Sequence, residues 1–125
     1  MNLILRRDQR KSLVGNIIFQ LDVRAEIDEE EHANIQRYKL GKTILYTKDQ
    51  ISDPGSGLLG LASRAAFRAM NISVSVDDLV SGKRIECKDI IEMIAVEEQI
   101  KEAAQTFKQV LYAATWFGGE EAIAL

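Results

Sequence analysis

A glycine-rich segment carries the strongest chemical signal in the sequence. Residues 55–60 read Gly-Ser-Gly-Leu-Leu-Gly and fit the pattern G-x-G-x-x-G. In dinucleotide-binding proteins this pattern lets the start of a helix approach a pyrophosphate. Asp77 and Asp78 follow at about the 20-residue distance at which such proteins place a ribose-binding carboxylate.

Three features separate segment 55–60 from a dinucleotide site. Residues 48–54 lie between the expected preceding strand and the first glycine, whereas that glycine should directly follow the strand. The sequence before it is not the continuous apolar run of a parallel-sheet strand, and the chain has too few expected strands for a complete nucleotide-binding fold. We therefore expect a turn into a helix capped by Ser56, with a phosphate or nucleotide site as the alternative.

Two arginines follow one turn apart on the helix expected over 58–70. Arg64 and Arg68 lie on its narrow polar edge, because most of its other positions are Leu or Ala. Paired guanidinium groups beside a glycine-rich helix start can hold an anion. Solvation, or pairing with neighbouring carboxylates, is the structural alternative. The anion-binding hypothesis comprises Gly55, Ser56, Gly57, Arg64 and Arg68.

The single histidine and the single cysteine do not predict catalysis. His32 follows Glu29 at the spacing of carboxylate-bridged di-iron bundles, but those centres need two such motifs and further glutamates. We expect His32 to be an exposed helix residue. Cys87 lies near an expected helix start, where a thiolate is stabilised, but lone cysteines are more often small core residues. The sequence therefore predicts no catalytic residue, no metal ligand and no cofactor, and it favours a protein that is not an enzyme.

A basic run lies near the amino terminus. Four of the six residues 6–11 are Lys or Arg, and we expect them on a solvated hairpin connection. No aromatic side chain interrupts the run, so there is no support for stacking on nucleic-acid bases. The formal net charge of −3 also argues against a nucleic-acid partner.

The hydrophobic pattern predicts the strands that position these residues. The clearest strand covers 16–27, where apolar and polar residues alternate with a period of two. Its face with Phe19, Leu21 and Val23 is expected to be buried. Strands are expected, in chain order, over 2–7, 16–27, 42–47, 72–76, 83–87 and 120–125.

Two capping boxes predict helix starts. Asp28 with Glu31 opens the first helix, and a second helix is expected over 58–70. Asp89 with Glu92 opens the third and longest helix, whose apolar residues recur at helical spacing almost to the end of the sequence. A turn or a single helical turn is expected over 78–82.

These elements and the composition predict the fold class. The 125 residues, 46% hydrophobic and 28% charged, are typical of one globular domain. We expect a single α+β domain over residues 1–125, with helices on one face of a mixed, mostly antiparallel sheet. The expected order is β-β-α-β-α-β-β-α-β, with a long third helix.

The same features lead to a functional expectation. The sequence starts without the charged and apolar segments of a secretory signal, and no window approaches the roughly 18 apolar residues of a membrane span. We expect a cytoplasmic binding or assembly module that forms homo-oligomers and takes a protein partner. The alternative is a small-ligand protein or enzyme that binds a phosphorylated or anionic compound at segment 55–60 with Arg64. The residues expected at an interface are Trp116, Phe117, Ile123 and Leu125.

Overall fold

The computed structural model describes residues 1–48 and 72–125. The α+β class, the antiparallel pairing and the long last helix are confirmed. The expected helix over 58–70 lies outside the described residues. The described elements are β1 (Asn2–Lys11), β2 (Ile17–Glu26), α1 (Glu29–Arg37), β3 (Ile44–Lys48), β4 (Ile72–Ser75), α3 (Val76–Ser81), β5 (Lys83–Cys87) and α4 (Ile90–Ala113).

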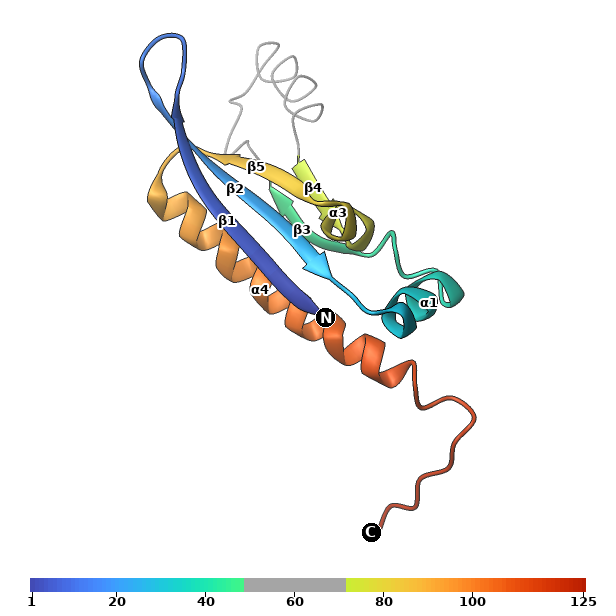
Figure 1. The fold of residues 1–125 in the computed structure, drawn as a ribbon. Helices are drawn as coiled ribbons and strands as arrows, with labels where there is room; N and C mark the ends of the chain where they lie inside the picture. Colours follow the sequence, from blue (N-terminus) through green and yellow to red (C-terminus); the bar gives the residue numbers. More distant parts are fainter. Residues whose placement is uncertain (49–71) are drawn as a thin grey trace, which may run out of the picture.

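The described strands form two antiparallel sheets rather than the one sheet expected. One sheet has the order β1-β2-β5, and the other pairs β3 with β4. β1 and β2 pair along their whole length, from Asn2 opposite Glu26 to Lys11 opposite Ile17. The long β1–β2 hairpin projects beyond the body at one end of the molecule (Figure 1). Period-two alternation shows which face of a strand is buried but not which strand lies beside it, so the division into two sheets has no local sequence signal.

The main core lies between the three-stranded sheet and α4, which crosses that sheet (Figure 1). Leu21 and Val23 of β2 and Ile100 of α4 are each at most 1% exposed. Alternation along β2 directs these two β2 side chains toward the helix, as expected, and Phe19 on the same face is half-buried. The β3–β4 pair contributes Tyr46 and Val74 to the same core, so α4 holds the two sheets together.

A second, smaller core lies near the last turns of α4. Ile35 of α1 and Val76 of α3 pack there with Phe107 and Leu111 of α4. Met1 packs against this cluster, so β1 begins beside the last turns of α4 (Figure 1). β1 and α4 therefore run in opposite directions.

Short polar contacts start the helices. Asp28 accepts a hydrogen bond from the Glu31 N–H at 2.7 Å, and Glu31 accepts one from the Asp28 N–H at 3.2 Å. This capping box is confirmed. At the start of α4, Asp89 accepts from the Glu92 N–H at 2.7 Å.

Two expectations about chain segments are wrong. The basic residues 6–11 do not lie on a connection, because β1 continues to Lys11 and the turn covers the residues between Lys11 and Ile17. Residues 120–125 form no strand. The reason is that α4 carries the chain past the start of β1, and the tail leaves the body where no described strand runs beside it (Figure 1).

Candidate functional site

The predicted anion-binding residues are not part of the described structure. Gly55, Ser56, Gly57, Arg64 and Arg68 all lie outside residues 1–48 and 72–125. The anion-binding hypothesis therefore stays a prediction.

The lone histidine and cysteine occupy the positions expected of them. His32 is exposed on α1, and Cys87 is 3% exposed in the main core. Tyr46 lies in the same core, and burial raises the pKa of its hydroxyl, with a smaller contribution from Cys87. Across the described residues, no three His, Cys, Asp or Glu side chains converge as metal ligands would.

The predicted interface residues lie together on the segment that follows α4. Trp116, Phe117, Ile123 and Leu125 are each at least 61% exposed. The Phe117 ring lies 5.5 Å from the ring of Tyr38, measured between centroids. The Trp116 ring meets Tyr112 edge to face at 5.6 Å. Beyond these contacts the tail runs away from the body (Figure 1).

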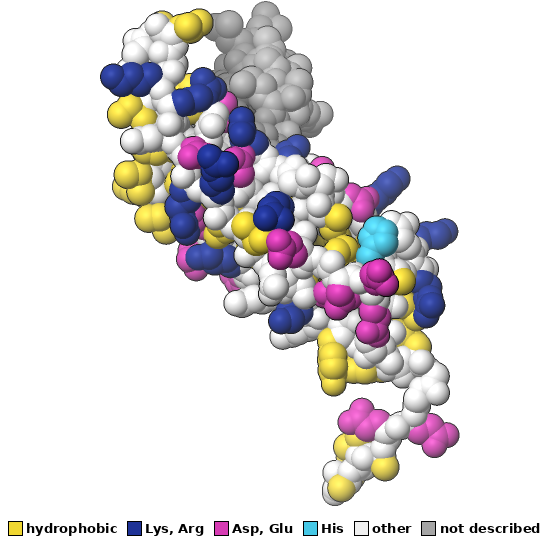
Figure 2. All heavy atoms as spheres, in the orientation of Figure 1, with side chains coloured by type: hydrophobic (Ala, Val, Ile, Leu, Met, Phe, Trp, Pro, Cys, Tyr) yellow, Lys and Arg dark blue, Asp and Glu magenta, His cyan; other side chains and the backbone are white. Residues whose placement is uncertain are grey.

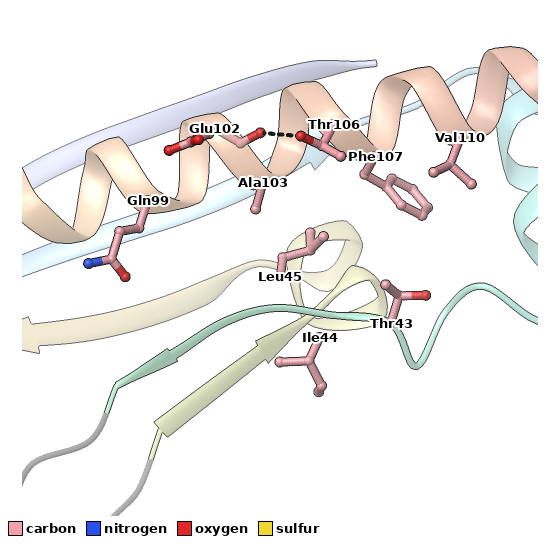
Figure 3. Close-up of a pocket in the computed structure, with 9 residues that line it drawn as sticks. All are labelled: Thr43, Ile44, Leu45, Gln99, Glu102, Ala103, Thr106, Phe107 and Val110. Carbon is pink, nitrogen blue, oxygen red and sulfur yellow. Dashed lines mark hydrogen bonds between the residues drawn. The ribbon is translucent and has the colours of Figure 1, made fainter.

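An apolar groove lies between β3 and α4 (Figure 3). Leu45 points from β3 toward the helix, and Ala103 and Phe107 point from the helix toward β3. The groove is open to solvent and has a volume of about 410 Å³. Its described lining residues are Thr43, Ile44, Leu45, Gln99, Glu102, Ala103, Thr106, Phe107 and Val110.

The side chains of this β3–α4 groove suit binding better than catalysis. Glu102 is the one ionisable residue among the described residues that line it. The Thr106 hydroxyl donates a hydrogen bond to the Glu102 carbonyl oxygen at 3.1 Å, so it is already engaged with the helix backbone. Acid–base catalysis needs titratable groups placed around a reacting atom. The groove offers apolar contact, which suits the apolar side chains of a protein partner.

The outer edge of β1 is a second candidate surface. Within the described part of the chain β2 is the only strand that pairs with β1, and no residue of β1 is buried. The Arg7 Nη2 group donates to Glu97 of α4 at 2.9 Å, and Glu97 is 4% exposed. The hydrogen bond and the charge of Glu97 raise the pKa of Arg7.

The sheet face turned away from α4 carries charges of both signs. Arg84 pairs with Asp22 at 2.8 Å, and Arg6 pairs with Asp8 at 3.0 Å. Figure 2 shows the Lys and Arg side chains interspersed with acidic ones over the hairpin. These pairs do not form the concentrated basic patch that nucleic-acid binding requires.

Sequence reasoning missed the β3–α4 groove and the Arg7–Glu97 pair. Gln99, Ala103 and Phe107 recur every four residues, so the sequence does contain one wall of the groove as a helical stripe. The other wall, β3, is distant in the sequence, and no local pattern connects the two. Arg7 and Glu97 are likewise distant, and only the folded sheet brings them together.

Comparison with protein-family models, with curated proteins and with solved structures finds no match for this chain. Of the helices in the described ranges, none has both the length and the apolar character needed to cross a lipid bilayer.

Proposed function

We propose that this chain is a cytoplasmic, non-enzymatic assembly module that forms homodimers and binds a protein partner. The observation that carries the proposal is the segment after α4, which exposes Trp116, Phe117, Ile123 and Leu125. Tryptophan and other aromatic residues dominate the binding energy of many interfaces. Exposed large apolar side chains gathered on one segment are typical of a contact surface.

The β3–α4 groove supports the binding part of the proposal. It is lined mostly by apolar side chains, and one of them, Phe107, also belongs to the smaller core. A groove of this size accepts one or two large apolar side chains of a partner. Val110 at its end is 42% exposed, so the groove opens to solvent there.

Light scattering tests the assembly part of the proposal. At tens of micromolar, the chain is expected to have twice the mass of one copy, and dilution is expected to dissociate it. Deleting residues 122–125 should weaken the dimer, because it removes Ile123 and Leu125. A monomer at these concentrations, with mass and stability unchanged by the deletion, would contradict the proposal.

The alternative, a protein that binds a phosphorylated or anionic compound, depends on the sequence of segment 55–60 and on Arg64. Calorimetry with inorganic phosphate and with a nucleoside diphosphate tests it. Saturable heat that is lost in the Arg64→Ala variant would support this alternative over the assembly module.

A further inference from the structure

We propose that residues 120–125 of one copy add to the edge of β1 in a second copy as an antiparallel strand. This inference rests on the proposed self-assembly and names the two surfaces that meet. In the described part of the chain, β1 is the edge of its sheet and has no strand on its outer side. An edge strand presents backbone groups to which an extended segment can hydrogen bond.

The two segments have complementary sequences when they run in opposite directions. β1 begins with the apolar residues 3–5 and continues with the basic run 6–11. The tail begins with Glu120 and Glu121 and ends with Ile123 and Leu125; Figure 2 shows its acidic side chains before its apolar end. Antiparallel pairing brings the acidic start of the tail to the basic run of β1 and the apolar end of the tail to residues 3–5. Parallel pairing would bring the acidic start of the tail to the apolar residues 3–5.

One register satisfies this complementarity on a single face of the sheet. It places Leu125 beside Leu3 and Ile123 beside Leu5, and then Glu121 beside Arg7. Leu3 and Leu5 already pack against the main core, so the two tail residues would extend that core. Directly opposed apolar pairs and opposite charges both stabilise antiparallel strands.

The position of the tail favours a second copy over its own sheet. Met1 packs beside the last turns of α4, so the tail leaves the body at the end where β1 starts (Figure 1). A tail that turned back onto its own β1 would run parallel to β1. Parallel pairing would place the acidic start of the tail beside the apolar residues 3–5. In a dimer whose two-fold axis passes by the middle of β1, the β1 strands of the two copies run in opposite directions. The Asn2 end of one β1, where that copy's tail starts, then lies near the Lys11 end of the other β1. The tail runs from there toward the Asn2 end of the other β1, antiparallel to it.

Disulfide cross-linking between two different variants tests this register. Chains carrying Arg6→Cys are mixed with chains carrying Ala122→Cys, because residues 6 and 122 would face each other. Facing residues in antiparallel strands lie about 5 Å apart, within the Cα–Cα limit of about 7 Å for a disulfide. Mild oxidation is expected to join residue 6 of one chain to residue 122 of the other, as identified by mass spectrometry of the linked peptides.

Two mixtures serve as controls for the cross-link. In the first, Lys11→Cys replaces Arg6→Cys and moves the thiol by five residues, about 17 Å along the strand; little linked product is expected. The second control is the native chain, whose single cysteine, Cys87, is 3% exposed. It measures the background of disulfide formation.

Charge reversal in the tail tests the acid–base part of the pairing. The variant Glu121→Lys, which places a lysine beside Arg7, is expected to raise the dimer dissociation constant about tenfold at low salt. The matched control Glu30→Lys changes the net charge equally at an exposed position on α1. It is expected to leave the dissociation constant within about twofold.

The outcomes separate this inference from the proposed function. A dimer that forms no 6–122 link and is unaffected by the tail reversal would overturn the inference and leave self-assembly in place. A monomer would overturn both. A 6–122 disulfide formed within one chain, in a variant that carries both cysteines, would overturn the inference in favour of the chain's own tail.

Discussion

Glu97 is the one charged side chain among the residues found buried in the described structure, and Arg7 is its partner. A carboxylate removed from water needs a hydrogen-bonding partner, and the loss of that partner costs more than the pair itself contributes. The strand that carries Arg7 is therefore coupled to α4 by a charge as well as by apolar packing.

We predict that Arg7→Met lowers the urea midpoint of unfolding, because it leaves the Glu97 carboxylate buried without its guanidinium. The double variant Arg7→Met, Glu97→Met should recover much of the loss, since the carboxylate is then absent too. Urea denaturation followed by circular dichroism measures both midpoints. A double variant less stable than Arg7→Met would show that the pair does not account for the loss.

Asp78 is the second residue with a distinct electrostatic role. The backbone N–H of Ser75 donates to the Asp78 carboxylate at 2.9 Å, and this hydrogen bond lowers the pKa of Asp78 below its ordinary value of 3.8. Because the folded-state pKa is the lower one, the contribution to stability is complete above the ordinary pKa. It is lost as the pH falls through the pKa of the folded state.

We predict that Asp78→Asn is less stable than the native chain at pH 7 and that the difference narrows in acid. The free energy of unfolding, measured in urea at pH 7 and near pH 3, checks this. Asp77→Asn is a suitable control, because Asp77 is exposed on the same helix. A difference that stays constant with pH would exclude the capping carboxylate as its cause.

At the scale of elements, α4 is the support shared by both cores. Its buried side chains recur on one face, and Phe107, which is 3% exposed, belongs to the smaller core and also lines the groove. Figure 3 shows the ring directed from α4 toward the start of β3. Removal of this ring would therefore affect both the smaller core and the β3–α4 groove.

We predict that Phe107→Ala lowers the free energy of unfolding by about 3–5 kcal/mol, the usual cost of emptying an aromatic core site. Phe117→Ala is the matched control, since Phe117 is 74% exposed; at a concentration where the chain is monomeric it should cost about 0.5 kcal/mol or less. Chemical denaturation compares the two. A loss below about 1 kcal/mol for Phe107→Ala would contradict its role in the core.

The elements that the sequence predicted well have local signals. The alternation of β2 located the strand to within one residue at each end, from 16–27 expected to Ile17–Glu26 observed. The side chains of Asp28 and Glu31 marked the start of α1. The helix α3 also has a local signal that was not used, because Ser75 and Asp78 form a capping box.

The elements that the sequence predicted poorly depend on distant partners. The second half of β1 is polar on both faces and resembles a loop in isolation. In the sheet, Arg10 meets Glu86 and Arg7 meets Glu97, and these pairs come from segments far along the chain. Of the candidate surfaces, the tail was named from its sequence, which has large aromatic residues before Gly118-Gly119 and an apolar end, whereas the β3–α4 groove required the fold.

At the scale of the whole molecule, assembly and stability are linked. A dimer that forms only from folded chains stabilises the folded state by mass action. We predict that the thermal midpoint of the native chain rises with protein concentration between micromolar and hundreds of micromolar. The variant Ile123→Asp, Leu125→Asp should show a midpoint independent of concentration, because both residues are exposed on the tail and their replacement leaves the core intact.

Scanning calorimetry at several concentrations measures these midpoints. Glu30→Lys, exposed on α1, should retain the concentration dependence of the native chain. A native midpoint that does not change with concentration would contradict homodimer formation.

The order β1-β2-β5 also has a consequence for folding kinetics. β1 and β2 are joined by a short turn in which Gly15 has a φ of +86°, so their pairing closes only a small loop. Asp22 of β2 and Arg84 of β5 are 62 positions apart, and their pairing closes a far larger loop with a greater loss of chain entropy. We therefore predict that the hairpin forms before β5 joins it. Gly15→Ala should then slow refolding in stopped-flow experiments, whereas Ile85→Val should mainly accelerate unfolding.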